Sequence, residues 1–465
     1  MTVENSKREL FENKPVFKAI TELALPSIVG QIILVIYNMA DTFFVSLAKG
    51  EGLITAVGVC MPAFMFLSAI SNLFGVGGAS VMSRAMGQKK MEKARLASAF
   101  AFWGCLAVTL LYSLGAYLFL DEFVDILGGG NPAVHELARS YIIVAVVLGG
   151  LPTAVNTLMA HLLRGEGKSF QASVGIVLGG VLNVILDPLF MFVILKPGQE
   201  ALGAAIATAL SNTIALLYYV VIIVKNRKKL VISVRFTPEF LRNRIPGDVI
   251  SVGTPACLMT LCENISYAIL DNLMEGYGVL AYQDGIGVAK KVNMLAHSVV
   301  RGMTQGVLPL IGYNYASGNR KRMEKVLYLS AAISFGISLL CMAVCLIAGY
   351  PITNLFFLGK ENPEAHGYAF DFLRILCVGA PFSALAYTVI SFFQAVGKSF
   401  SSLILALMRK GIIDIPLMFI LQPWLQKYGI VLATPLADLL CAVAAVLLYW
   451  NFIKKHRRET AELKV

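Results

Sequence analysis

Residues 181–190 place two polar side chains, Asn183 and Asp187, inside an otherwise apolar stretch. Their spacing of four residues puts both side chains on one face of a helix. Pro188 would free a backbone carbonyl about one turn earlier, near the same face. In a membrane a carboxylate costs about 2.5–3.5 kcal/mol to insert, so it is expected to face a cavity or a partner. The stretch therefore predicts a buried site rich in oxygen atoms.

Three helices are expected to bring side-chain oxygens to one depth. Asp41, Asp187 and Thr208 are each eight or nine residues from a polar residue at the outer end of their span, which is Lys49, Lys196 and Glu200 respectively. At about 1.5 Å per residue, these distances correspond to roughly 12–13 Å from the outer surface. The sequence thus predicts one cation-coupling site in the outer half of the first lobe, formed by Asp41, Asn183, Asp187 and Thr208.

The chemistry expected of this site is the binding of one small cation. Two carboxylates close together in a low dielectric do not both stay ionised unless a cation joins them. A proton would satisfy the pair, and so would Na⁺, because carboxylate, amide and hydroxyl oxygens suit a hard cation. No other metal and no cofactor is expected. The structural alternative is that each acid only hydrogen-bonds a neighbouring helix.

The second half offers acids in a different setting. Glu263 and Asp271 lie in its first helix and are candidates for a second ion site. Asp414 follows Arg409 and Lys410 by about one turn, so these charges can neutralise one another. A second ion site and a structural pair between Asp414 and Arg409 are both compatible with the sequence.

Further polar residues and two prolines stand at membrane depth in the expected helices. Tyr37 and Asn38 precede Asp41 by about one turn, and Asn156 lies in the fourth expected helix, so these three are candidates to line a substrate cavity. Pro26 and Pro255 lie early in the first helix of each half and should kink those helices. A kink that straightens would change the shape of the cavity, whereas a static bend would only affect packing.

The composition is that of a multi-pass membrane protein. Hydrophobic residues make up 57% of the 465 residues and charged residues 14%, whereas soluble domains have about 45–50% apolar residues. Apolar stretches of about 20 residues are long enough to cross a bilayer. They predict an all-α integral membrane protein with twelve transmembrane helices, at about residues 20–46, 52–80, 95–120, 138–162, 168–195, 200–225, 247–274, 279–312, 326–350, 367–396, 399–422 and 428–453.

The distribution of positive charge indicates how the protein is oriented in the membrane and does not indicate nucleic-acid binding. The formal net charge is +11, but the basic clusters all fall on one side of the twelve-span arrangement, while the opposite loops hold scattered residues such as Lys49, Lys196 and Lys360. By the positive-inside rule, both termini are predicted to be cytoplasmic. The start of the chain lacks a cleavable signal pattern, so the first helix should remain in the cell membrane, which we expect to be a prokaryotic plasma membrane.

The two halves of the chain resemble each other at an offset of about 230 residues. Gly167-Lys-Ser-Phe corresponds to Gly397-Lys-Ser-Phe, and Leu25-Pro26 corresponds to Thr254-Pro255. Six spans per half place the pseudo-symmetry axis along the membrane normal. The expected domains are an N-terminal six-helix lobe at 1–225, a cytoplasmic linker at 226–245 and a C-terminal six-helix lobe at 246–465.

Several function classes are disfavoured by what surrounds the candidate motifs. The two Gly-Lys-Ser sequences lack the earlier glycine of a phosphate-binding loop, because Leu162 and Phe392 occupy that position. The five histidines are scattered, and the eight cysteines show no metal-like pairing with them. An enzyme is therefore not expected, and transport should be driven by an ion gradient rather than by ATP.

These motifs, in this order, resemble the multidrug and toxic compound extrusion (MATE) family over nearly the whole chain. The resemblance is carried by Leu25-Pro26 with Asp41, the glycine-rich run at 75–80 with Ser83-Arg84 and Gly87, Arg164-Gly-Glu-Gly, the run from Asn183 to Pro188, and Gly203-Ala-Ala-Ile-Ala-Thr208. It implies an antiporter that exports organic cations in exchange for H⁺ or Na⁺ by alternating access, and we expect the protein to be a monomer. It also implies that Asp41, Asn183, Asp187 and Thr208 are the N-lobe cation site and that Pro26 is a bending point.

The resemblance also bears on the second half and on the main alternative. Glu263 resembles the acid of the branch that binds a cation in its C-terminal lobe, but the second acid of that branch has no counterpart at Ala380-Pro-Phe-Ser-Ala. A flippase for lipid-linked sugars, in the same wider superfamily, would need a more cationic cavity. The cations at membrane depth that could supply it are Lys290, Lys291, Arg301, Arg409 and Lys410.

Overall fold

The computed structural model describes residues 7–48, 53–128, 132–241, 244–357 and 362–462, and all of its regular elements in these ranges are helices. Lys49, Lys360 and residues 242–243 of the expected linker lie outside the described residues. In the first half the helices are η1 (Glu9–Asn13), α2 (Val16–Leu47), α3 (Leu53–Gly87), α4 (Met91–Leu118), α5 (Leu120–Ile126), α6 (Pro132–Ile142), η2 (Ile143–Leu148), α7 (Gly150–Gly165), α8 (Ser169–Pro188), η3 (Leu189–Ile194) and α9 (Glu200–Asn226). In the second half they are η4 (Pro238–Leu241), α10 (Ile245–Glu275), α11 (Leu280–Ala316), α12 (Arg320–Asn354), α13 (Pro363–Val378), α14 (Ala380–Val396), α15 (Ser399–Leu407), η5 (Met408–Ile412) and α16 (Asp414–Glu462).

These helices make twelve membrane passes. Eight segments are long and apolar enough to span a bilayer, and two further passes are bent helix pairs, α6–α7 with a bend of 48° and α13–α14 with a bend of 43°. The helix α11 has the length of a span but carries Lys290, Lys291 and Arg301. The last long segment contains two passes, because the backbone turns at Gln426 (φ 51°, ψ −134°) within α16. The all-α, twelve-helix prediction is confirmed.

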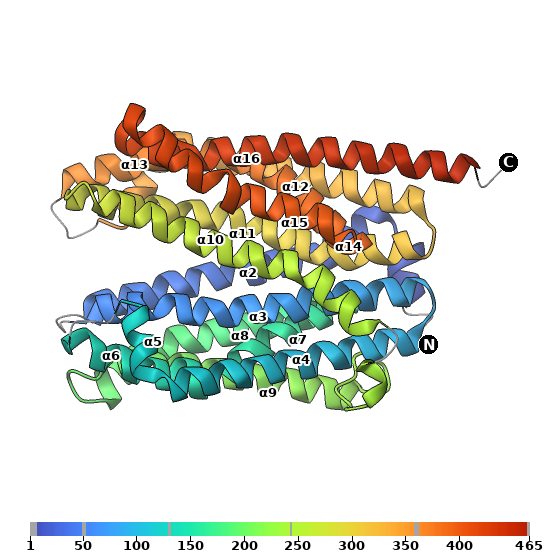
Figure 1. Ribbon diagram of the computed structural model, residues 1–465, viewed down its shortest axis with the longest axis horizontal. Coiled ribbons are helices and arrows are strands. Elements are labelled where there is room, and N and C mark those ends of the chain that lie inside the picture. The colour runs from blue at the N-terminus through green and yellow to red at the C-terminus, as the bar shows by residue number, and fades with distance from the viewer. Residues whose placement is uncertain (1–6, 49–52, 129–131, 242–243, 358–361, 463–465) are drawn as a thin grey trace.

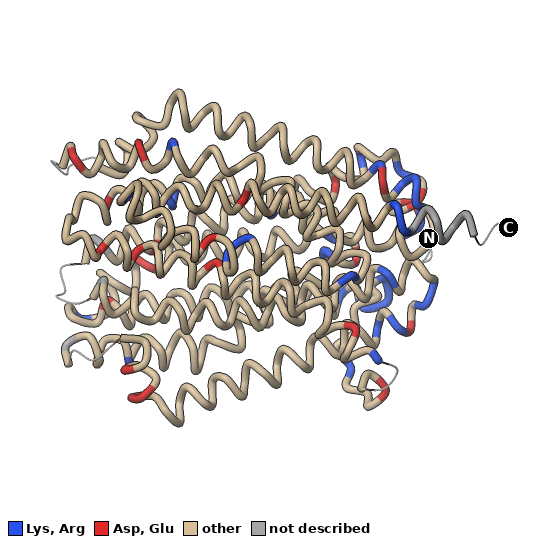
Figure 2. The backbone as a smooth tube through the Cα atoms, turned by 45° about the horizontal axis from the view of Figure 1, so that its top comes forward, with Lys and Arg blue, Asp and Glu red and all other residues tan. Residues whose placement is uncertain are grey.

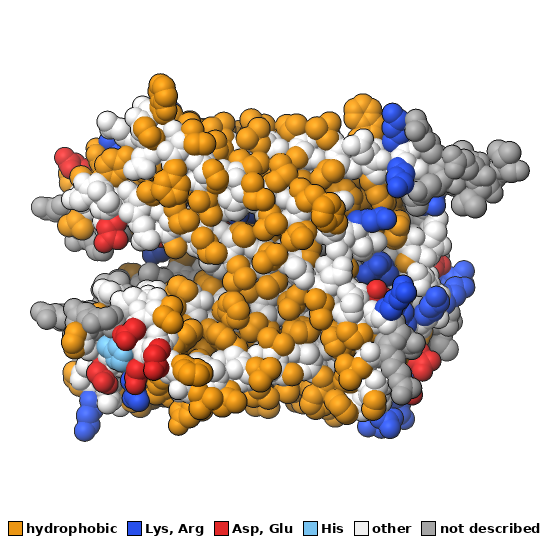
Figure 3. All heavy atoms as spheres, viewed as in Figure 1, with side chains coloured by type: hydrophobic (Ala, Val, Ile, Leu, Met, Phe, Trp, Pro, Cys, Tyr) orange, Lys and Arg blue, Asp and Glu red, His pale blue; other side chains and the backbone are white. Residues whose placement is uncertain are grey.

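The surface of the molecule matches a bilayer. Large apolar side chains are exposed on it, among them Leu111, Ile347 and Trp424, and Figure 3 shows hydrophobic side chains covering the zone between the two ends of the molecule. Lysine and arginine residues gather at one end, where both ends of the described chain also lie (Figure 2). We call this the basic end. An apolar belt with a charged cap is the pattern expected of a protein embedded in lipid.

The helices form two bundles that are related by a pseudo-twofold. Figure 1 shows α3–α9 in the lower layer and α10–α16 in the upper layer. The first helix of each half packs against the second helix of the other half, since α2 contacts α11 and α3 contacts α10. Such reciprocal contacts are what a twofold arrangement produces. The internal repeat of the sequence therefore corresponds to a repeat in the structure.

Glycines let the bundles approach closely near the basic end. A Cβ atom at Gly253 of α10 would lie 1.7 Å from the Leu73 carbonyl oxygen of α3, and one at Gly77 would lie 2.2 Å from the Val249 carbonyl oxygen. At the crossing of α2 and α11, a Cβ atom at Gly302 would lie 2.4 Å from the Cα atom of Ile28. Small residues allow such backbone contact between membrane helices. The bundles are therefore in contact near the basic end, while the surface is hollowed between them at the opposite end (Figure 3).

The connection between the bundles is held at the basic end by a buried carboxylate. Glu166, just after α7, accepts hydrogen bonds from Lys7 Nζ at 2.8 Å, from the Val231 amide at 2.8 Å and from the Ile232 amide at 3.3 Å. Its side chain is fully buried. Residues 230–232, which follow α9, are also buried. One side chain therefore fixes both the start of the described chain and the segment that leads to the second bundle.

Replacing Gly253 with alanine is expected to disrupt the contact near the basic end. The new methyl group would overlap the backbone of Leu73, and overpacking of this kind costs about 1–3 kcal/mol. Gly247→Ala is the matched control, because it lies in the same helix and a Cβ atom there meets nothing within 4 Å. In thermal unfolding of the purified protein, Gly253→Ala should melt several degrees below Gly247→Ala. Equal melting temperatures would show that the two bundles do not need this contact.

Candidate functional site

The helices α8 and α9 bring three of the four predicted oxygen-bearing side chains together. Asn183 Nδ2 donates to Asp187 Oδ1 at 3.2 Å and lies 3.3 Å from Thr208 Oγ1. Asn183 and Asp187 share one face of α8, as their spacing predicts, and Thr208 faces them from α9. All three are buried, and Asp187 is completely inaccessible to solvent. The amide of Asn183 thus ties the carboxylate to the neighbouring helix.

The fourth predicted residue, Asp41, approaches this group from α2. The helix α2 packs along α8, and the charges of Asp41 and Asp187 are close enough to interact. Tyr37 and Tyr141 lie near both carboxylates. Gly180 makes room for the Tyr37 ring, since a Cβ atom there would be 2.9 Å from the ring. Asp41 is only half-buried, so the pair consists of one enclosed acid and one more accessible acid.

Two oxygen atoms in this group lack a partner. Among the described residues, neither Asp187 Oδ2 nor Asn183 Oδ1 receives a hydrogen bond, and both are buried. Buried acceptors are nearly always satisfied, so an unsatisfied pair requires an explanation. A carboxylate oxygen and an amide oxygen are both able to coordinate a cation. The arrangement is chemically suited to hold a proton or Na⁺, because its other atoms are a second carboxylate and a hydroxyl.

The backbone departs from regular α-helix directly after this group. Pro188 ends α8, and the chain continues as the π-helical segment η3. Proline lacks an amide proton, so it cannot complete the hydrogen bond expected of a continuous helix. Wide turns of this kind are frequent at functional positions in helices. Pro26 and Pro255 both lie inside uninterrupted helices, α2 and α10, and their role as bending points stays a prediction.

The residues predicted to line a substrate cavity lie near this site but make separate contacts. Asn156 of α7 donates to Asn212 Oδ1 of α9 at 3.0 Å, while its own Oδ1 atom is buried without a partner among the described residues. Tyr37 and Asn38 are half-buried on α2. The Asn38 carbonyl accepts a hydrogen bond from Thr42 at 2.9 Å. Their part in substrate binding stays a prediction.

In the second bundle the candidate acids are paired with cations. Glu263 Oε1 lies 2.5 Å from Arg301 Nη2, and Asp271 pairs with Lys290. The Arg301 guanidinium also faces the Tyr387 ring. Each of these acids therefore already has a counter-charge.

The predicted ion pair between Asp414 and Arg409 is wrong, because each of the two residues pairs with a different one. Asp414 Oδ2 lies 2.9 Å from Lys410 Nζ and accepts from Ser266 at 2.6 Å. Arg409 instead pairs with Asp438 of α16 at 2.9 Å. Two adjacent residues on a helix point in different directions, and Lys410, four residues before Asp414, is the one that shares its face. The sequence signal that was available for Asp438 is that it is an acid inside the last apolar span.

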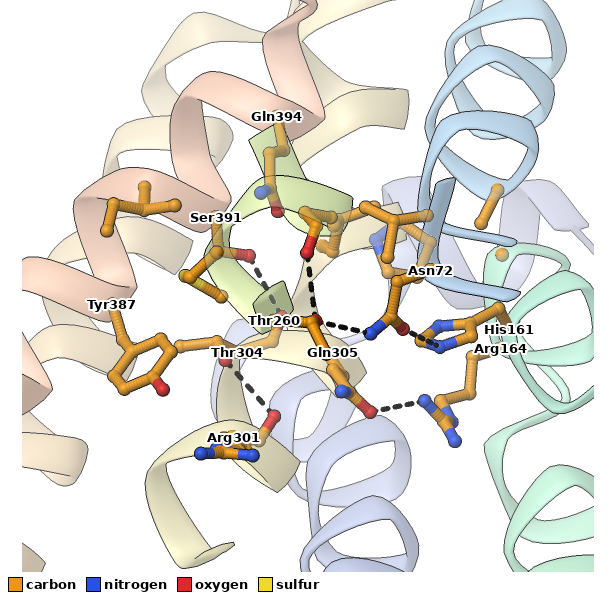
Figure 4. A pocket seen from close by; sticks show the side chains of 18 of the residues that line it. Asn72, His161, Arg164, Thr260, Arg301, Thr304, Gln305, Tyr387, Ser391 and Gln394 are labelled. Carbon is orange, nitrogen blue, oxygen red and sulfur yellow. Dashed lines mark hydrogen bonds between the residues drawn. The ribbon is translucent and has the colours of Figure 1, made fainter. Parts of the chain in front are cut away.

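A cavity between the bundles is lined by residues of both, including Glu263 and Arg301 of the second bundle (Figure 4). Asn72 Nδ2 of α3 donates to Thr260 Oγ1 of α10 at 2.8 Å, and Asn72 Oδ1 lies 3.1 Å from His161 Nε2. Arg164 of α7 donates to the Gln305 amide oxygen of α11. These contacts join the two bundles across the cavity. The sequence alone does not predict that these polar residues lie together, because they come from helices far apart in the chain.

The comparisons with known proteins agree on a family. A family model described as MatE matches residues 26–189 and again 255–420, so the two matches start 229 residues apart, as the internal repeat predicts. The multidrug export protein MepA of Staphylococcus aureus (strain MRSA252) is 27% identical over 454 residues, covering 97% of this chain and 98% of that protein. MepA of Staphylococcus haemolyticus (strain JCSC1435) is 26% identical over 465 residues, covering 97% of each chain.

A solved structure shows the same architecture. The outward-facing conformation of a multidrug resistance MATE family transporter superimposes with a TM-score of 0.88 at 25% identity, covering 97% of this chain and 98% of that chain. Its similarity extends over both bundles. Together with the twofold family match, the twelve-pass architecture and the sequence relatives, it shows that the chain belongs to the MatE family of membrane transporters.

Proposed function

We propose that the protein exports organic cations across a prokaryotic plasma membrane in exchange for H⁺ or Na⁺. The observation that carries the proposal is the buried group of α8 and α9, in which Asp187 Oδ2 and Asn183 Oδ1 have no hydrogen-bond partner among the described residues. Asp41 adds a second negative charge from α2. A bound cation would stabilise these buried oxygen atoms. The named relatives are multidrug export proteins.

The direction of transport follows from the charge distribution and the packing. The basic end is assigned to the cytoplasm by the positive-inside rule. The close glycine contacts lie in that half, so the described arrangement corresponds to a state open toward the outside. In this state an ion from outside reaches the more accessible Asp41 first and is then shared with the enclosed Asp187. An organic cation bound near the same charges is then displaced, because both ligands compete for the same two carboxylates.

The flippase alternative needs free positive charge, but four of the five cations named for it have an acidic partner among the described residues. Three of the cations that could provide it are engaged: Lys290 by Asp271, Arg301 by Glu263 and Arg409 by Asp438. Lys410 is engaged by Asp414. We therefore favour the export of organic cations.

The test is dye transport by the purified protein in proteoliposomes. A fluorescent organic cation should move across the membrane when a pH gradient or a Na⁺ gradient is imposed alone, and an ionophore that collapses the effective gradient should stop it. ATP without a gradient should have no effect. Protein-free liposomes under the same gradients are the control. Dye movement that is insensitive to both gradients would refute ion-coupled antiport.

A further inference from the structure

A groove on the second bundle lies apart from the sites described above. The described residues that line it come from α12, α13, α14 and α16, and its volume is about 610 Å³, which is within the range of small-molecule sites. Two of its lining side chains, Leu346 and Val378, are 37% and 44% exposed. The groove therefore opens onto the apolar surface of the molecule, and in a bilayer this surface meets lipid.

The groove is apolar along most of its length and polar at one end. Of the described residues that line it, eight are apolar, and the other three are Asp371, Arg374 and Tyr428. Tyr428 directly follows the turn of α16 at Gln426, and Leu439 lies farther along the same pass, so the groove extends about 16 Å along the helix. Its polar end is the one opposite the basic end, where α13 begins (Figure 1). This shape suits a lipid whose acyl chain lies along the helices.

The polar end lies at the depth of lipid headgroups. The helix α12 has 35 residues and is therefore about 52 Å long, which exceeds the hydrocarbon thickness of about 30 Å by roughly 20 Å. Half of this excess, roughly 10 Å, extends into the headgroup region at each end. Asp371 lies about 12 Å from the start of α13 at Pro363, which is near the boundary between headgroups and acyl chains. Arg374 is one turn deeper, and its long side chain can reach the same level.

The two charges at this end are open to a ligand. Arg374 is exposed, and its guanidinium lies 5.4 Å from the centre of the Phe370 ring. Asp371 Oδ2 accepts a hydrogen bond from the Tyr428 hydroxyl at 3.4 Å. Although they are three residues apart on one helix, neither Arg374 nor Asp371 belongs to an ion pair among the described residues. A charge on a surface that faces lipid is costly, so a ligand that supplies both counter-charges would be stabilising.

We propose that this groove binds one phospholipid with an ethanolamine headgroup, taken from the leaflet opposite the basic end. The Arg374 guanidinium binds the phosphate, because its fork of donors matches two phosphate oxygens. The Asp371 carboxylate accepts hydrogen bonds from the ammonium group, which in this headgroup is separated from the phosphate by a short two-carbon link. Side chains three residues apart on a helix have Cβ atoms about 5–6 Å apart, which suits this link. One acyl chain occupies the apolar part of the groove.

The proposal goes beyond the export function and does not depend on it. None of the residues that line the groove belongs to the group formed by Asp41, Asn183, Asp187 and Thr208, or to the cavity between the bundles. Binding of this lipid is therefore measured without any gradient or dye, and its failure would leave the proposed export untouched.

The test is native mass spectrometry of the purified protein, titrated with phosphatidylethanolamine or with phosphatidylglycerol of the same acyl chains. The wild type should bind phosphatidylethanolamine more tightly. Arg374→Gln should weaken the binding of both lipids about tenfold or more, because a charged donor to the shared phosphate is lost. Asp371→Asn should weaken phosphatidylethanolamine by a similar factor and should not weaken phosphatidylglycerol, which has no ammonium group. The preference between the two lipids would then disappear.

Two further variants and a soluble competitor locate the site. Val378→Trp places a large apolar side chain at the mouth of the groove and should weaken both lipids without lowering the melting temperature, since Val378 is exposed. Arg139→Gln removes an exposed arginine of the first bundle and should bind both lipids like the wild type. Glycerophosphoethanolamine, which has the headgroup but no acyl chain, should not displace the lipid.

Three results would overturn the proposal. Equal binding of the two lipids by the wild type, Arg374→Gln and Asp371→Asn would mean that the headgroup is not recognised. Unchanged binding by Val378→Trp would place the lipid outside the groove. Efficient displacement by glycerophosphoethanolamine would show that the apolar part of the groove does not hold a chain.

Discussion

Asp187→Asn is expected to lower gradient-driven export of a cationic dye by about five- to 150-fold, the range that corresponds to coupling free energies of about 1–3 kcal/mol between two ligands. The substitution keeps the size of the side chain and its place beside Asn183, but it removes the charge for which ion and dye would compete. The measurement is the initial rate of dye transport in proteoliposomes under the effective gradient.

A control variant and an exchange measurement distinguish a loss of ion coupling from a loss of folding. Asp271→Asn is the matched control, because this acid also lies inside a membrane helix but is half-exposed and paired with Lys290. It should keep most of the transport rate. Exchange of labelled for unlabelled dye without any gradient shows whether the Asp187→Asn protein still binds its substrate. If Asp187→Asn retains gradient-driven export and Asp271→Asn loses it, the coupling ion binds in the second bundle instead.

The first-bundle site was predictable from the sequence because its geometry depends on regular helices. A rise of about 1.5 Å per residue fixes the depth of each side chain once the ends of the helices are known. A spacing of four residues likewise places Asn183 and Asp187 on one face. Neither argument needs the position of any distant side chain, and the structure accordingly brings Asn183, Asp187 and Thr208 into contact.

The other polar groups depend on how helices are rotated and on which distant segments meet. Arg409 and Lys410 are neighbours in sequence, yet they pair with acids on two different segments, Asp438 and Asp414. The spacing of four residues between Lys410 and Asp414 is visible in the sequence, whereas nothing in the sequence marks Asp438 as the partner of Arg409. The contact between Arg164 and Gln305 joins residues 141 positions apart. Spacing along one helix carries no information about such pairs.

The largest change in the free energy of unfolding is expected when the ion pair between Arg409 and Asp438 is broken. Both side chains are 1% exposed, and the two groups are 2.9 Å apart. Arg409 also donates to Ser383 at 3.1 Å and lies 4.1 Å from the centre of the Tyr387 ring. Arg409→Gln should lower the free energy of unfolding by about 3–5 kcal/mol, because it leaves the Asp438 carboxylate buried without its counter-charge. Titration with a denaturing detergent, followed by the loss of helical signal, measures this change.

The double variant Arg409→Met with Asp438→Leu tests whether the ion pair only supports the structure or also takes part in transport. Replacing a buried ion pair by apolar side chains of similar size is often neutral, so the double variant should be much more stable than Arg409→Gln alone. Arg139→Gln, which breaks an exposed pair with Asp121, should cost less than about 1 kcal/mol. If the double variant is stable and exports dye, the pair acts as structural support. If it is stable but inactive, the second bundle takes part in transport through these charges, and the assignment of coupling to the first bundle alone is wrong.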